Sequence, residues 1–233
     1  MLKNLILSAA AAGLAAGIFT AVVQHVTTTP IIIEAERYEG SGQSHAAAVP
    51  DQPAAMSSAE PESQVWAPTD GIERTLYTSL ATTVLGVGFG LALLAAMSLA
   101  GVSINARTGL AFGVAGFIAV ALAPALGLPP EIPGGAAADL GARQAWWFFA
   151  VAATAVGIAG LLLTHTTWMQ IGGVVLIALP HIVGAPVTHA YSSTAPAELA
   201  GHFAAASLAV TAVFWALLGS ASGAIYERLS RQP

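Results

Sequence analysis

The chain carries six apolar runs that are long enough, or nearly long enough, to cross a lipid bilayer as helices. A spanning helix needs about 20 mostly apolar residues. That length predicts helices over residues 4–26, 76–102, 108–126, 145–164, 168–183 and 198–226. Only 8% of the 233 residues are charged, whereas soluble domains carry about a quarter. The sequence therefore predicts an all-α, polytopic transmembrane helix bundle, with residues 1–233 forming a single integral membrane domain.

The fifth run, residues 168–183, has the weakest spanning signal. It is short, contains Gly172 and Gly173, and has Pro180 near its end, and such segments also occur as re-entrant or interfacial pieces. About six spans are therefore predicted, and five stay open. The first run follows Lys3 in the manner of a signal peptide, but its apolar stretch is too long and no clear cleavage region follows. We expect a retained anchor.

Lysine and arginine in short loops indicate the orientation of a membrane protein, because they favour the cytoplasmic side. With six spans, Lys3, Arg107, Arg228 and Arg231 all fall on one side of the membrane. We therefore predict that both termini are cytoplasmic.

Residues 40–71 join the first two spans on the external side. They are rich in Gly, Ser, Ala, Pro and acidic residues, which predicts a flexible external linker. Before this linker, Thr29 and Pro30 are typical of a helix start, and we expect a short interfacial helix there.

Four of the six histidines fall near the predicted outer ends of helices: His25, His181, His189 and His202. Glu198 lies four residues before His202 in the last predicted helix, so the two side chains share a face. Neutral imidazole is the commonest metal ligand in proteins, and carboxylates add oxygen ligands and negative charge. These residue types suit a borderline divalent ion such as Co²⁺, Ni²⁺ or Zn²⁺.

The sequence thus predicts an external metal site with the ligands His25, His181, His189, His202 and Glu198, and with Glu34, Glu36, Glu39 and Glu131 attracting the ion. The alternative is that each histidine lies at the membrane interface and hydrogen-bonds to backbone. Inward from this site, the helices offer few polar side chains for a path, namely Gln24, Thr82, Thr83, Ser98, Thr154 and Thr211.

Other function classes lack the residues that they require. The chain has no cysteine, which excludes thiolate metal sites and cysteine nucleophiles. No HExxH pair occurs, the GSASG stretch has Ala221 where a nucleophilic serine would stand, and Lys3, the only lysine, is not in a phosphate-binding loop. A net charge of −5 without a basic stripe argues against nucleic-acid binding. We expect no enzyme activity and no permanently bound cofactor.

Paired glycines four residues apart predict close approach of transmembrane helices. They occur at Gly13/Gly17, Gly86/Gly90 and Gly219/Gly223. Near the fourth span, Asp139 and Arg143 are spaced to pair with each other, and Trp146 and Trp147 are typical of an interfacial anchor.

Several stretches resemble one known family. QHVTTTPIIIEAERYE at residues 24–39, LPHIVGAP at residues 179–186 and, above all, the block with GLPPEIPG at residues 127–134 followed by RQAWW at residues 143–147 are similar to blocks of the CbtA family of predicted cobalt-transport membrane subunits. The resemblance spans nearly the whole chain. It implies a multi-pass protein of the bacterial inner membrane that takes up cobalt for cobalamin synthesis. It also implies a small single-helix partner subunit, CbtB, which brings its own histidines.

The expected function is therefore a permease subunit for a divalent transition-metal cation, with Co²⁺ the favoured cargo. Two alternatives stay open: a structural or accessory subunit of a larger membrane complex, and a haem-binding protein in which His25 faces His202 or His181. A homo-oligomer also stays open.

Overall fold

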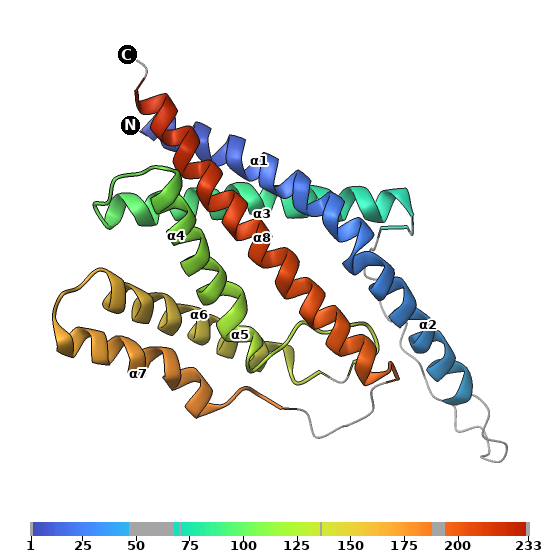
Figure 1. The fold of residues 1–233 in the computed structure, drawn as a ribbon. Helices are drawn as coiled ribbons and strands as arrows, with labels where there is room; N and C mark the ends of the chain where they lie inside the picture. The colour runs from blue at the N-terminus through green and yellow to red at the C-terminus, as the bar shows by residue number, and fades with distance from the viewer. Residues whose placement is uncertain (1, 47–67, 70, 136, 188–193, 232–233) are drawn as a thin grey trace.

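A computed structural model describes residues 2–46, 68–69, 71–135, 137–187 and 194–231. Within these ranges every regular element is helical (Figure 1). The elements are α1 (Leu2–Val26), α2 (Thr28–Ala46), α3 (Ile72–Leu99), α4 (Ala106–Phe117), the π-helical segment η1 (Ile118–Leu122), α5 (Ala123–Ala125), α6 (Leu140–Leu162), α7 (Thr167–Val183) and α8 (Ala197–Ser230). The predicted all-α class is confirmed.

In the described part of the chain, five helices are long and apolar enough to cross a membrane: α1, α3, the continuous α4–η1–α5 helix, α6 and α8. The remaining apolar helix, α7, has 17 residues and falls just below that length. It runs back alongside α6 as the second arm of a hairpin (Figure 1). The described part of the bundle therefore has five helices of spanning length and one shorter apolar helix at the place of the predicted fifth run.

The helices run alternately in opposite directions, so the bundle has two distinct ends (Figure 1). The terminal end holds both chain termini, the α3–α4 turn and the α6–α7 turn, and there the Asn4 side-chain amide donates to the Leu229 carbonyl at 3.3 Å. The α2 end holds α2 and the starts of α3, α6 and α8. Lys3, Arg107, Arg228 and Arg231 belong to segments at the terminal end, as the predicted topology requires.

Glycine contacts bring three pairs of helices together. A Cβ atom on Gly86 of α3 would lie 2.6 Å from the Gly13 carbonyl oxygen of α1, and one on Gly219 of α8 would collide with the backbone of Gly109 in α4. In each pair, the helices can approach this closely only because both residues at the contact are glycines without a side chain. The predicted packing role of the three glycine pairs is confirmed.

The third close contact joins α6 to α7. A Cβ on Gly157 would lie 2.6 Å from the Gly173 carbonyl oxygen, and the reverse substitution meets the Gly157 carbonyl at the same distance. Among the described elements, α7 packs on α6 alone. The hairpin is therefore joined to the rest of the bundle through α6.

The largest buried cluster lies where α1, α3 and α8 meet. Ala12 and Ala16 of α1 pack there with Leu93 of α3 and with Phe214, Trp215 and Leu218 of α8. Phe89 of α3 adds a third ring, 4.9 Å from Trp215 and 6.4 Å from Phe214 between ring centroids. Small side chains on α1 thus make room for aromatic side chains from the other two helices.

The third span changes its hydrogen-bond register just before a proline. Pro124 is fully buried and follows the π-helical segment η1. Proline has no backbone N–H, and its ring clashes with the carbonyl of the residue four positions earlier, here Val120. The wider π turn, in which the Ala123 N–H reaches the Ile118 carbonyl, moves that carbonyl out of the way. The helix therefore runs unbroken from Ala106 to Ala125, one residue past the proline.

Helix α2 continues directly from α1 after a single turn residue, Thr27, and packs against other elements. Ala35 of α2, Ile132 of the loop after α5 and Ala195 just before α8 form a small buried cluster. The helix extends through residues 40–46, the first part of the predicted linker; residues 47–67 and 70 of that linker lie outside the described residues.

Candidate metal site at the α2 end

His25 lies in the last turn of α1, where the chain passes into α2, and its side chain is exposed. It borders two hollows. One has a volume of about 400 Å³ and is also lined by Thr29, Glu34 and Arg37. The other, about 730 Å³, lies between the α1–α2 junction and the start of α3. His25 is therefore accessible to an ion from both sides of the junction.

Glu198 and His202 occupy the first two turns of α8 and are both exposed. The helix begins after Pro196, as predicted, and the four-residue spacing places the two side chains on one face. One carboxylate and one imidazole on adjacent turns can bind the same ion. Two ligands leave most of a metal's coordination sphere to water or to other groups.

His181 lies in the last turn of α7, half-buried against α6. Its ring meets Trp146 edge to face, with 6.2 Å between ring centroids. The buried Trp146 indole N–H donates to the Pro180 carbonyl oxygen at 3.3 Å, which fixes the turn that carries His181. The Trp146 ring in turn fills the space that a Cβ on Gly127 would need, 2.5 Å from the ring edge. Trp146 is thus a packed residue, 7% exposed, and its indole orients the end of α7.

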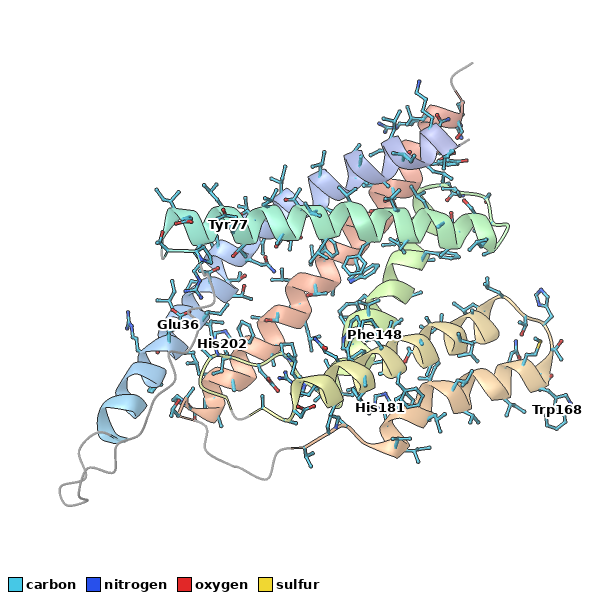
Figure 2. The ribbon with its side chains drawn as sticks, turned by 180° about the vertical axis from the view of Figure 1, so that it is seen from behind. Glu36, Tyr77, Phe148, Trp168, His181 and His202 are labelled. Atoms are coloured by element: carbon cyan, nitrogen blue, oxygen red, sulfur yellow. The ribbon has the colours of Figure 1, made fainter. Side chains whose placement is uncertain are left out.

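The structure places these candidates at the same end of the bundle, on three different helices. Figure 2 shows His181 and His202 well separated from each other. Among the described residues, no group of three or more His, Asp or Glu side chains is close enough to hold a metal ion. His189 lies outside the described residues. The set of five ligands stays a prediction, and its described members are distributed around the α2 end of the bundle, which forms its rim.

Two of the four carboxylates expected to attract an ion are paired with arginines. Glu36 of α2 pairs with Arg74 of α3 at 2.5 Å, and Glu131 pairs with Arg143 of α6 at 2.6 Å. An ion pair presents little net charge to a cation. Glu34 is exposed and lines the smaller hollow beside His25, and the side chain of Glu39 lies outside the described part of the chain.

The expected Asp139–Arg143 pair is wrong. Asp139 is the N-cap of α6, where its carboxylate accepts from the Ala142 N–H at 2.9 Å. Capping satisfies a backbone donor that has no partner within the helix. Arg143 is consequently available to Glu131, which lies earlier in the chain on the loop with three prolines.

A family model described as "Probable cobalt transporter subunit (CbtA)" matches residues 2–227. The match covers α1 through α7 and all but the last three residues of α8, so it includes the end of the bundle that carries the candidate histidines. The chain belongs to the CbtA family. No curated protein and no solved structure matches it. Membership in the CbtA family, together with the five long apolar helices, identifies a multi-pass membrane protein of the cobalt-transporter-subunit type.

In this CbtA protein, the polar groups inside the bundle differ from those expected from sequence. Thr83 and Ser98 donate to carbonyls of their own helix, at 2.7 and 2.8 Å. Buried side-chain atoms without a hydrogen-bond partner belong instead to Ser8, Thr20, Arg143, Thr154 and Ser222, within the described part of the chain. Of these, only Thr154 was expected as a path group. Small hydroxyl residues in an apolar run give too weak a sequence signal to show which of them face a neighbouring helix.

Proposed function

We propose that this chain is the permease subunit for uptake of a divalent transition-metal cation, Co²⁺ in the first place, with Ni²⁺ and Zn²⁺ as alternatives of the same chemistry. Membership in a family of probable cobalt transporter subunits carries the proposal. The membrane is the bacterial inner membrane, and both termini are cytoplasmic. The position of Lys3, Arg107, Arg228 and Arg231 at the terminal end supports this orientation.

The α2 end then faces outward and receives the ion. His25, His181, His189, His202 and Glu198 act as ligands around the rim, and exposed Glu34 attracts the cation toward His25. Because Glu198 and His202 supply two ligands on one face of α8, this pair is the first place where the ion loses water. The described ligands are distributed over three helices, so a full coordination sphere needs His189, a helix movement or groups from a partner.

The family description as a subunit supports a complex. We propose that the partner is the small single-helix protein of CbtB type, whose histidines complete the ligand set, and that the spanning helices contact the lipid bilayer. Transport needs no permanently bound cofactor and no catalysis by this chain. Exposed His25 and His202 give no support to a buried bis-histidine haem site.

Radioactive cobalt uptake in cells that express the complex tests the proposal. We compare His202→Ala and His181→Ala with His165→Ala, a matched control because exposed His165 lies in the α6–α7 turn at the terminal end. Protein in the membrane is quantified for each variant. Uptake should fall in the first two variants and stay normal in the control. Normal uptake in both rim variants removes the site assignment.

A structural or accessory role is the second candidate, favoured by the glycine contacts that dominate the helix interfaces. It predicts the reverse pattern, in which histidine substitutions leave function intact and Gly219→Leu prevents assembly. Purification of the complex with each variant, followed by measurement of bound cobalt, separates the two candidates.

A further inference from the structure

Several hydroxyl groups of the bundle are satisfied locally. Those of Thr75, Thr83, Ser98, Thr164 and Ser220 donate to the carbonyl oxygen four residues earlier, at 2.6 to 2.9 Å. Such bonds satisfy a hydroxyl inside its own helix. Ser8, Thr20 and Ser222 make no bond of this kind, although they are only 0%, 5% and 0% exposed. These three hydroxyls are buried with no partner in the described structure.

The four-residue spacing indicates that all three lie along the contact between α1 and α8, the α1–α8 seam. Ser8, Ala12, Ala16 and Thr20 are spaced by four residues and form one stripe on α1. The two alanines of this stripe pack against Phe214, Trp215 and Leu218 of α8. Ser222 follows Leu218 by four residues and therefore lies on the same face of α8.

The register of the two helices places the hydroxyls on both sides of the apolar cluster. The helices are antiparallel, and the bond from Asn4 to Leu229 fixes their alignment at the terminal end. Ser8 and Ser222 therefore lie within about one helical turn of each other along the seam, between that bond and the cluster. Thr20 lies beyond the cluster, about one turn before Gln24 and His25.

A buried hydroxyl without a partner costs free energy, and this cost is usually removed by water or a ligand. Three such groups on one seam, between a histidine at one end and an asparagine at the other, need such a partner. The apolar cluster between them is the kind of constriction that excludes water until the helices separate. The other two atoms without a partner, in Arg143 and Thr154, belong to α6 and lie outside this seam.

We propose that the α1–α8 seam is the route by which a hydrated divalent cation crosses the bundle, with Thr20 binding its water shell on the outer side and Ser8 and Ser222 on the inner side. The inference rests on the proposed transport function and adds its path. The hydroxyl oxygens accept hydrogen bonds from the water molecules bound to the ion. Phe214 and Leu218, facing Ala12 and Ala16, close the seam at rest, and their displacement opens it.

Single cysteines test whether water reaches the seam, and the absence of native cysteine gives a clean background. Ser8→Cys, Thr20→Cys and Ser222→Cys are exposed to a small charged thiol reagent, with Ala150→Cys as the control, because Ala150 is 0% exposed on α6. We expect the seam cysteines to react much faster than the control, and cobalt to slow their reaction. Reaction at the control rate, with and without cobalt, overturns the route.

Uptake measurements provide the second test. They use alanine variants, so the proposal is still tested if a cysteine disturbs packing and reacts poorly for that reason. Ser8→Ala and Ser222→Ala are compared with Ser220→Ala, whose hydroxyl donates to its own helix. Each seam variant should lower the cobalt uptake rate roughly fivefold, the effect of one hydrogen bond. The control should transport normally. Normal rates in both seam variants, in cells where His202→Ala abolishes uptake, reject the route and leave the transport function standing. Absence of uptake in the unmodified complex rejects the transport function itself.

Discussion

Substitution of Gly86 by alanine should weaken the α1–α3 contact, and the same substitution at Gly88 provides the reference for its size. The new Cβ would lie 2.6 Å from the Gly13 carbonyl oxygen, about 0.8 Å short of the 3.4 Å at which ordinary contact begins. The obstacle is backbone, so the two helices must separate. Overpacking of this size costs about 1–3 kcal/mol. Alanine also has the better helix propensity, which contributes about 1 kcal/mol in the opposite direction.

Gly88 isolates the steric effect, because it lies on the same helix and a Cβ there meets nothing within 4 Å. Gly88→Ala should therefore gain the propensity term alone. The free energy of unfolding of Gly86→Ala should be lower than that of Gly88→Ala by the steric cost, about 1–3 kcal/mol. Circular dichroism of purified protein, titrated from mild detergent into a denaturing one, measures both. Equal stability of the two variants would refute the close packing of α1 on α3.

Three further results are expected. Trp146→Phe should lower the unfolding free energy by about 1 kcal/mol, because it removes the indole N–H donated to the Pro180 carbonyl. Trp146→Ala should lower it by about 3–5 kcal/mol through the lost packing. Thermal unfolding checks both: unchanged stability of Trp146→Phe would contradict the hydrogen bond, and equal losses in the two variants would contradict the packing contribution. Asp139→Ala should lower the unfolding free energy by about 1 kcal/mol in the same assay, because the α6 cap is lost, while Asp139→Asn keeps a capping oxygen and should be nearly neutral. A large loss of stability in Asp139→Asn would instead indicate a role for the charge. Cobalt affinity of the purified complex should fall on acidification, because imidazole must be neutral to ligate; titration followed by the visible absorption of Co²⁺ measures it, and an affinity independent of pH would exclude histidine ligands.

The sequence predicts helix position well and helix contacts only in part. Apolar length determines where a span begins and ends, so residues 4–26 and 168–183 correspond closely to α1 and α7. The spacing of Gly109 and Gly113 follows the same four-residue rule as the other pairs and was visible in the sequence. The contact between Gly157 and Gly173 has no such signal, because it joins one glycine from each arm of a hairpin.

Local rules that compete with one another limit the prediction of polar contacts. Asp139 satisfies both the spacing of an ion pair with Arg143 and the position of a helix cap, and only the structure shows that the cap is formed. The π turn before Pro124 likewise has no sequence signal of its own, because a proline near the end of a span can follow a π turn or can simply end an α-helix. Whether the rim histidines lie close together depends on the angles between helices, and the hydropathy of the sequence does not predict these angles.

The shortness of α7 has a consequence for the lipid around it. Seventeen residues cover about 25 Å as a helix, whereas the hydrocarbon core of a typical bilayer is about 30 Å thick. Because α7 packs on α6 alone among the described elements, lipid surrounds most of the circumference of α7. The bilayer must therefore become thinner around it. The match between the α6–α7 hairpin and the membrane therefore depends on acyl-chain length, and reconstituted vesicles with shorter chains should match the hairpin better than vesicles with longer ones.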